Sequence, residues 1–202
     1  MFPRNFLHEN REEGCIMVGP DRKYYHTGTA FIKRSLRRHE WTELCGQPSA
    51  PSAAMPHRYR NDAAIVRYLR QHTDIPLPEV QCVFEDDGAV YLVSTFIEGT
   101  VNMGDLADAH RRVVEKELLR HVATLKTLRS NRPGVPGQSV MVPPQRVVGA
   151  EGWGFHAGWR GRDDLVGEFV FCHNDLGESS AVARARADEL SAWSAQRLQA
   201  PS

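Results

Sequence analysis

The amino-acid sequence predicts an α+β protein, and two observations support this prediction. In the first hundred residues, short β-rich runs surround one helical segment, and turn residues separate the runs. Beyond Gly99 the pattern changes to one long helical repeat, followed by a stretch with many Gly and Pro residues. Strands gathered in one part of the chain and a long helix in another are typical of the α+β class.

The first half contains an apolar strand, a hairpin, a loop and a helix, in that order. Cys15–Val18 is the apolar strand, and Gly28 lies in the turn of the hairpin. Residues 46–58, with three prolines and no periodicity, are expected as a loop. The helix is expected from about Asn61 and must end before Pro76. Its apolar face comprises Ile65, Tyr68, Leu69 and His72.

The next segment has the clearest hairpin signal in the chain. Two β-rich runs, residues 80–84 and 89–93, flank an acidic turn that ends in Asp87-Gly88. The second strand continues through residues 94–97 and breaks at Glu98-Gly99.

A helix is expected from about Asp105 to Arg129 because apolar residues recur every three or four positions. This stripe comprises Val114, Leu118, Val122, Leu125 and Leu128. Residues 138–168 are expected as loop, and Glu168–Cys172 as a short strand. The last stretch, from Ser179 onward, fits either a helix or a frayed tail.

Composition excludes two classes of partner. The 202 residues include 25 Lys and Arg and 25 Asp and Glu, so the formal net charge is zero. Nucleic acids and anionic membranes attract proteins with an excess of basic residues, so neither is expected here. No apolar run approaches the roughly 20 residues that a membrane span needs. The N-terminus lacks the pattern of a secretory signal, which leads us to expect a cytoplasmic protein.

The cysteines and histidines suggest no metal site. Four cysteines lie far apart without a C-x-x-C pair, and the nine histidines show no ligand spacing. Two disulfides are conceivable in number, but a cytoplasmic chain favours four reduced thiols. The cysteines are Cys15, Cys45, Cys82 and Cys172.

Two residues are candidates for catalysis and for anion binding. Asp175, in the triplet His173-Asn174-Asp175, follows an apolar strand, where a carboxylate can accept a proton from a substrate hydroxyl. Lys33 lies inside an apolar strand, where an ammonium must reach water or meet an anion. Taken alone, the triplet can arise by chance. Also taken alone, the basic run of Lys33, Arg34, Arg37 and Arg38 is typical of a solvated basic face.

Two further features lie between these candidates. Asp62, near the start of the helix, is placed to pair with Lys33, although alone it is typical of a carboxylate near a helix N-terminus. Residues 94–97 end a strand at a junction between two parts of the chain, where backbone groups can contact an adenine. They are Ser94, Thr95, Phe96 and Ile97.

The order of these features resembles the aminoglycoside phosphotransferase and choline-kinase-like family, in detail its fungal branch. The resemblance extends from about residue 15 to 177 and is most specific in residues 125–131 and 169–176. It implies a protein-kinase-like two-lobed fold, with a small antiparallel-sheet N-lobe and an incomplete helical C-lobe. Residues 1–97 would form the N-lobe, residues 98–177 part of the C-lobe, and residues 178–202 a divergent tail rich in Ala, Arg and Ser.

The resemblance also implies an activity, which is ATP-dependent, Mg²⁺-dependent phosphorylation of a hydroxyl on a small molecule. Lys33 would contact the phosphates and Asp62 would be its acidic partner, where the family more often has Glu. Asp175 would be the catalytic base, and His173 would support the catalytic loop. Residues 94–97 would line the adenine pocket.

The sequence departs from the family after the triplet, as if truncated. Ser180 stands where the family has a metal-binding Asn, and a hydroxyl is a poorer Mg²⁺ ligand than an amide oxygen. No later apolar strand ends in Asp, and neither Asp164 nor Asp188 has the expected context. Phosphoryl transfer depends on metal ions that neutralise the phosphates, so we expect little activity.

Several interpretations remain open for a chain with this departure. The first is a phosphotransferase that has an atypical metal site or works with a partner chain. The second is a catalytically dead kinase-like remnant that binds a nucleotide or a protein. The third is a mis-predicted gene product. Because the helices that complete the C-lobe are missing, the 105–129 helix is expected to expose apolar surface and to favour self-association. The acceptor substrate is not specified by these residues.

Overall fold

The computed structural model describes residues 12–19, 21–44, 47–49, 54–131, 134–135, 137, 169–171 and 182–184. The chain divides into two compact units, of which the first includes the chain up to Phe96 and the second begins at Ile97. An antiparallel sheet and a helix dominate the first unit, and a long helix dominates the second, which confirms the α+β class.

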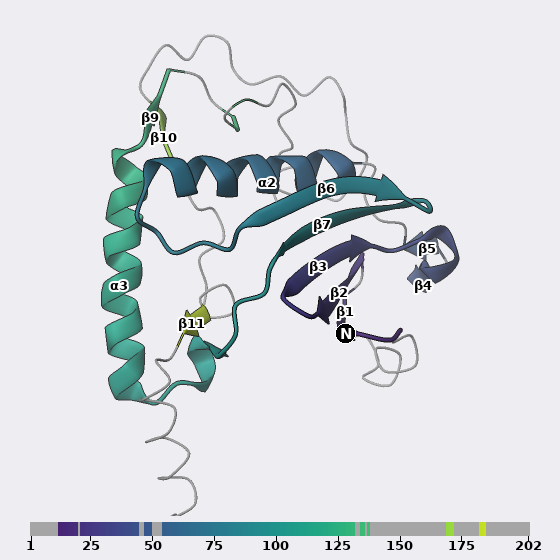
Figure 1. The fold of residues 1–202 in the computed structure, drawn as a ribbon, viewed down its shortest axis with the longest axis horizontal. Helices are drawn as coiled ribbons and strands as arrows, with labels where there is room; N and C mark the ends of the chain where they lie inside the picture. The colour runs from purple at the N-terminus through teal and green to yellow at the C-terminus, as the bar shows by residue number, and fades with distance from the viewer. Residues whose placement is uncertain are drawn as a thin grey trace, which may run out of the picture. The chain divides into compact units, whose positions relative to one another are not determined.

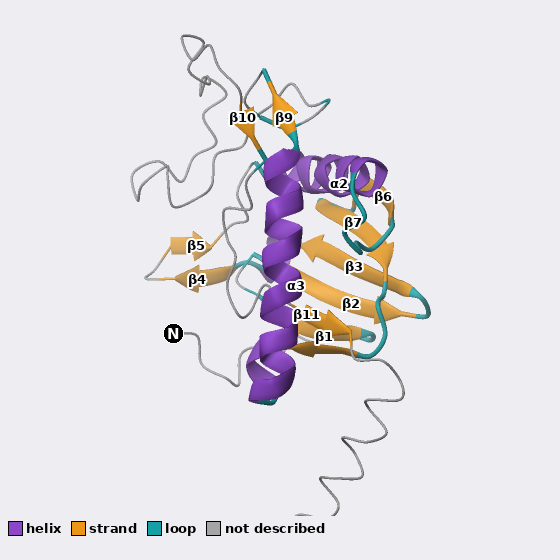
Figure 2. Ribbon diagram, turned by 90° about the vertical axis from the view of Figure 1, so that its left-hand side faces the viewer, coloured by secondary structure: helices purple, strands orange, loops and turns teal. Residues whose placement is uncertain are grey.

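The first unit is built on a five-stranded sheet in the order β1-β2-β3-β7-β6, in which every neighbouring pair is antiparallel (Figure 2). Both expected hairpins are present. Gly28 turns between β2 and β3, and Asp87 and Gly88 turn between β6 and β7 with φ values of 47° and 67°. Two successive positive φ angles suit the twist of a two-residue hairpin, and Asp-Gly favours them. The strands are β1 (Cys15–Val18), β2 (Arg22–Thr27), β3 (Ala30–Ser35), β6 (Val80–Asp86) and β7 (Ala89–Thr95).

Helix α2 (Met55–His72) covers one face of this sheet, along β6 and β7 (Figure 1). Three of its buried residues, Met55, Tyr59 and Ala63, recur every four positions and form one stripe against the strands. The resulting core contains Met55, Tyr59, Ala63, Val80, Val90 and Leu92. This packing holds α2 beside the strands that carry the candidate residues.

The helix differs from the sequence prediction in its start and in its buried face. It begins at Met55, within the stretch expected as loop, because Pro56 in the first turn lacks only an N–H that the helix does not use there. Leu69 is buried as expected, but His72 is exposed and its ring stacks on Tyr68. The expected loop also contains the short strand β5 (Gln47–Ser49), which pairs with β4 (Thr42–Leu44) after the 3-10 helix η1 (Arg38–Glu40).

The second unit contains α3 (Asp108–Thr127), which confirms the long helix expected from the apolar stripe. Leu125 of the stripe is buried, whereas Val113 and Leu119 on other sides of α3 are exposed. Residues 182–184, expected as helix or frayed tail, form a strand instead. The remaining elements are the strand pair β8 (Thr100–Asn102) and β11 (Val182–Arg184), the pair β9 (Arg129–Ser130) and β10 (Phe169–Val170), and the 3-10 helix η2 (Met103–Asp105).

Two further expectations concern the segment 138–168 and membrane-spanning helices. The loop expected at residues 138–168 lies outside the described residues. In the described part of the chain, the helices are too short or too polar to cross a membrane.

Candidate functional site

Lys33 lies near the middle of β3, on the sheet face that α2 covers. The register pairs it with Tyr24 of β2 and with Leu92 of β7, and Leu92 belongs to the core under α2. Residues paired across neighbouring strands point to the same face, so Lys33 shares the α2 face. Among the described residues, no side chain forms an ion pair or hydrogen bond with its ammonium.

Asp62, on α2, interacts with Lys33 through space without forming a direct ion pair. Its side chain reaches water, yet the protein around the carboxyl is dense enough that desolvation raises the pKa of Asp62 above its ordinary value. The positive charges of Lys33, Arg22 and Arg58 oppose that rise. The two residues that the sequence predicted as partners therefore interact electrostatically without a direct ion pair.

The other two cations near Asp62 differ in how they are neutralised. Arg22 donates two hydrogen bonds of 2.8 Å to the carboxylate of Asp21, an arrangement that raises the pKa of Arg22. Arg58 lies one helical turn before Asp62, and within the described ranges no carboxylate forms an ion pair with it. Among the described residues, Lys33 and Arg58 thus both act electrostatically on Asp62, and neither forms a direct ion pair.

Aromatic rings lie on the same face as Lys33. Three of them, Tyr24, His26 and Phe31, come from β2 and β3 and were not among the residues predicted from the sequence. Tyr24 stacks on Phe31 with ring centroids 5.9 Å apart, and His26 stacks on Phe96 at 3.6 Å. The register pairs His26 with Phe31, two residues before Lys33, which places all these strand positions on one face. β2 carries rings at three consecutive positions, 24–26, and the alternation of a strand places the first and third of them on one face. Flat rings next to a cation suit a ligand with both a base and a phosphate.

β7 ends at Thr95, two residues before the end that the sequence predicted, so Phe96 and Ile97 follow the strand. The amides of Thr95 and Phe96 are already engaged. Ser94 is buried and pairs with Phe31 and Val80 on the neighbouring strands. The Thr95 N–H donates to the carbonyl of Glu79 at 2.8 Å, and the Phe96 N–H donates to that of Thr29 at 2.7 Å. Ile97 begins the second unit. Adenine contact by residues 94–97 stays a prediction. A contact through the amide of Thr95 or Phe96 would require that amide to give up its present hydrogen bond.

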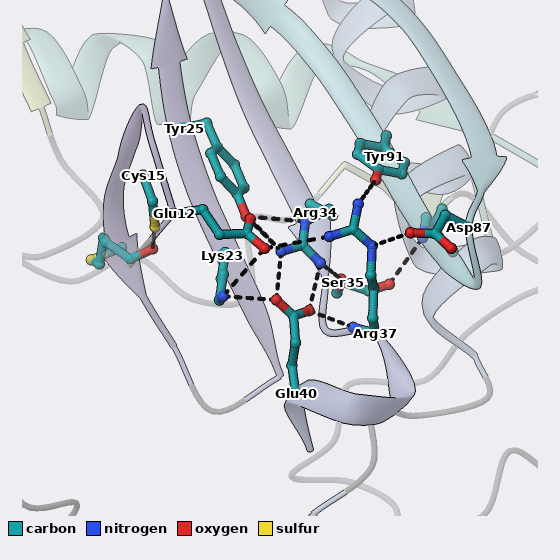
Figure 3. Close-up of polar contacts among 12 residues, drawn as sticks. Glu12, Cys15, Lys23, Tyr25, Arg34, Ser35, Arg37, Glu40, Asp87 and Tyr91 are labelled. Atoms are coloured by element: carbon teal, nitrogen blue, oxygen red, sulfur yellow. Dashed lines mark hydrogen bonds and ion pairs between the residues drawn. The ribbon is translucent and has the colours of Figure 1, made fainter. Parts of the chain in front are cut away.

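The opposite face of the sheet carries a buried network of charges, shown in Figure 3. Glu40 accepts hydrogen bonds from the Lys23 ammonium at 2.7 Å, from both terminal nitrogens of Arg34 at 2.6 and 2.8 Å, and from the Arg37 amide at 2.7 Å. Lys23 and Arg34 are only 3% and 2% exposed. Glu12 accepts from Arg34 at 2.9 Å and from the Tyr25 hydroxyl.

This network corrects the interpretation of the basic run as a solvated face at Arg34, which is buried, although Arg38 is exposed as that interpretation expects. Lys33 and Arg34 are neighbours in a strand and point to opposite faces. Arg34 is buried and pairs with the buried Glu40 and with Glu12, which is exposed. Arg37 pairs with Asp87 at 2.7 Å and donates to the Tyr91 hydroxyl. Lys23 and Arg34 are thus paired within the protein, whereas Arg38 is exposed. The contrast with Lys33 makes the α2 face the candidate site for a ligand.

The network shifts the titration of its members in a consistent direction. Burial alone would raise the pKa of Glu40, but the hydrogen bonds from Arg34, Lys23 and the Arg37 amide hold it well below the usual range. Burial likewise works to lower the pKa of Arg34, but the bonds to Glu40 and Tyr25 raise it. Both groups therefore stay charged at neutral pH.

We expect the protein to lose stability in acid, through Glu40 in particular. A carboxylate whose pKa is lowered by folding stabilises the fold fully above its unfolded pKa, near 4.3, and loses that contribution as the pH falls toward the folded value. The pKa of Glu12 is also lowered, because Tyr25, Arg34 and Lys23 outweigh partial desolvation, and this adds to the effect. The pKa of Asp62 is raised, which opposes it. Melting temperatures recorded from pH 6 to pH 3 should fall most steeply below about pH 4.5. A midpoint that stays constant over this range would contradict the assignment.

The residues predicted for catalysis, His173 and Asp175, lie outside the described residues, as does Ser180. The strand that precedes them is described over Phe169–Val170 and pairs with β9, and the Phe171 amide donates to the carbonyl of Leu128. In the described ranges, no group of three or more His, Cys, Asp or Glu side chains is placed to hold a metal ion.

The fold and the site together define an α+β protein with an antiparallel sheet, one covering helix, and a cationic and aromatic face beside that helix. No protein-family model matches the sequence, and no curated protein matches it. Among solved structures, the chain is similar to one described as the co-crystal structure of WbdD and the kinase inhibitor LY294002. That likeness has a TM-score of 0.37 and 17% sequence identity, and it covers 57% of this chain and 26% of that chain. The match thus spans about a quarter of the WbdD chain's length.

Proposed function

We propose that this chain is a kinase-like protein of the aminoglycoside phosphotransferase and choline-kinase-like type, and that it binds the phosphates of a nucleoside triphosphate at Lys33. The observation that carries the proposal is the contrast between the two faces of the sheet. Lys23 and Arg34 contact carboxylates directly, whereas no described residue pairs directly with Lys33. A partly buried ammonium without such a partner favours an anionic ligand.

The residues on the α2 face fit such a ligand in two respects. The ammonium of Lys33 matches a phosphate group, and the stacked rings beside it offer a surface for a nucleobase. ATP bound there would bring a transferable phosphoryl group. This chain's own contribution would be to orient the phosphates through Lys33, with Asp62 limiting the excess positive charge on that face.

The proposal predicts that ATP with Mg²⁺ raises the melting temperature. A ligand at about 100 times its Kd adds about 2.7 kcal/mol to the free energy of unfolding, which moves the midpoint by several degrees in a chain of this size. Lys33→Met keeps the length of the side chain and removes its charge, so it should weaken ATP binding by about tenfold to a hundredfold. Lys116→Met, at an exposed position of α3, is the control and should bind ATP like the wild type. If neither ATP alone nor ATP with Mg²⁺ shifts a cooperative melt, nucleotide binding is refuted.

A second candidate function is phosphoryl transfer to a hydroxyl of a small molecule, supported by the triplet that ends in Asp175. A carboxylate at the end of a strand can take the proton of the attacking hydroxyl. The Ser at position 180, where the resemblance expects a metal-binding Asn, favours the binding function over this one.

Asp175→Ala separates the two candidates. If the wild type phosphorylates an acceptor in the presence of ATP, the substitution should abolish turnover and leave the ATP-dependent shift in melting temperature unchanged. Turnover that survives Asp175→Ala would exclude Asp175 as the base. Absence of turnover in both proteins, with the thermal shift intact, would leave binding as the function.

A further inference from the structure

We propose that the free edge of β6 binds a second copy of this chain, so that two five-stranded sheets join into one across a two-fold axis at Val83. β6 is the last strand of the sheet, and in the described part of the chain no strand pairs with its outer edge (Figure 2). An edge strand whose backbone groups are unpaired is a template for another strand. This inference concerns assembly and goes beyond the proposed nucleotide binding.

The register of the hairpin identifies the backbone groups that face outward. Asp86 and Ala89 flank its two-residue turn, so they form a hydrogen-bonded pair of the antiparallel ladder. Such pairs alternate with non-bonded pairs along the strands. Phe84 therefore directs its N–H and C=O to β7, whereas Val83 and Glu85 direct theirs to the free edge.

The edge strand is regular and partly apolar. Phe84 is 43% exposed and stacks on Tyr91 with ring centroids 4.7 Å apart, and Cys82 on the same face is exposed as well. From Val80 to Asp86 the strand contains no Lys and no Pro, two residues that commonly protect a sheet edge from pairing. Its register irregularity lies at the start, between Val80 and Cys82, and leaves the remainder able to pair.

Charge complementarity identifies the partner as a second copy. On α2, Arg67 lies at the start of β6, where its guanidinium donates to the carbonyls of Val80 and Gln81 at 3.4 and 3.5 Å. Among the described residues, no carboxylate forms an ion pair with Arg67. Near the other end, Glu85 accepts from Arg60 through Oε1, and within the described ranges its Oε2 has no partner. An edge with a cation at one end and an available carboxylate oxygen at the other is complementary to itself when two copies run antiparallel.

Antiparallel pairing about Val83 satisfies the backbone, charged and apolar groups together. With Val83 opposite Val83 of the second copy, Glu85 lies opposite the second copy's Gln81, next to its Arg67. Phe84 then lies opposite the second copy's Cys82, on the face away from α2, and loses part of its exposed surface. A two-fold axis forms each of these contacts twice.

Sedimentation velocity of the full chain, over about 1 to 200 µM, tests the inference. One strand pair buries less surface than an obligate dimer does, so we expect a dimer that dissociates on dilution with a Kd of about 1–100 µM. Arg67→Glu faces the carboxylate of Glu85 with a like charge and should weaken the dimer about tenfold or more. The double variant Arg67→Glu, Glu85→Arg exchanges the two charges and should recover part of this loss. Lys116→Glu, at an exposed position of α3, is the control and should dimerise like the wild type.

The exposed thiol of Cys82 reports on the register independently. In the proposed dimer, the two Cys82 residues are diagonal neighbours, about 7–8 Å apart across the axis. A short bis-maleimide should therefore link two wild-type chains, and Cys82→Ser should abolish the link. A covalent dimer that Cys82→Ser forms equally well would overturn the inference.

The remaining outcomes are equally decisive. A wild type that is monomeric at about 200 µM overturns the inference, as does a dimer that Arg67→Glu leaves unchanged. No recovery in the double variant overturns the contact between Arg67 and Glu85 and with it the proposed register. If Arg67→Glu lacks a cooperative melt, the cross-link through Cys82 decides. A monomeric chain that still binds ATP would overturn this inference alone, and a dimer that binds no ATP would refute the proposed function alone.

Discussion

Glu40→Gln should lower the free energy of unfolding by about 3–5 kcal/mol at pH 7. The Glu40 side chain is 8% exposed and is the shared acceptor for Lys23, Arg34 and the Arg37 amide. A neutral amide of the same shape brings an N–H₂ donor among these donors and leaves two buried cations with one carboxylate fewer. Removing one partner of a buried ion pair costs much more than the pair contributes, because the remaining charge is not solvated.

Urea unfolding followed by circular dichroism measures this loss, and Glu85→Gln is the matched control. Glu85 pairs with Arg60 on the surface, where both side chains are about half exposed, so its loss should cost at most about 1 kcal/mol. The gap between wild type and Glu40→Gln should narrow as the pH falls below about 4.5, since the wild-type carboxylate then begins to lose its advantage. Equal effects of the two substitutions would show that the network is solvated.

Leu92→Ala should cost about 2–5 kcal/mol, the second large effect. Leu92 is buried on β7, an interior strand of the sheet. It belongs to the core cluster to which α2 contributes Met55, Tyr59 and Ala63. Truncation removes apolar contacts and leaves a cavity under the helix that carries Arg58 and Asp62. Because a close-packed core relaxes only partly, the cavity adds to the lost transfer free energy.

Leu119→Ala provides the comparison, since Leu119 is 69% exposed on α3. A surface change of this kind should stay within about 0.5 kcal/mol. The measurement is again the midpoint of urea unfolding at constant slope. A loss at Leu92 as small as the loss at Leu119 would mean that α2 does not pack on the sheet as the structure describes.

The local elements of this fold were readable because each depends on neighbouring residues. Asp87 and Gly88 tolerate positive φ, so the hairpin of β6 and β7 followed from four consecutive residues and their flanking β-rich runs. The stripe of α3 followed from helical periodicity in the same way. The start of α2 did not, because Pro and Ala residues before Asn61 are compatible with both loop and helix, and packing of Met55 and Tyr59 on the sheet decides between them.

In the candidate site too, some residues could be predicted from the sequence and others could not. Lys33 was predictable as a residue of interest, since a lysine in an apolar strand is unusual. Asp62 was expected near the helix start, where a carboxylate is ordinary, but α2 begins at Met55 and places it about two turns into the helix. The direct pairing of Arg34 was not, because its partners Glu12 and Glu40 come from segments with no strong pattern of their own. Arg58 carried no sequence signal either, since an arginine on a helix is normally a solvated residue.

The sequence by itself determined which segments form strands, turns and the long helix, because hydrogen-bonding preferences and periodicity act over a few residues. Only the tertiary structure decided which charges meet. Lys33 and Arg34 are adjacent in the chain, yet Arg34 is neutralised by carboxylates on one face while Lys33 has only the distant Asp62 on the other. The physical reason is that electrostatic interactions depend on distances through space, and the folded sheet and α2 set those distances between residues far apart in the sequence.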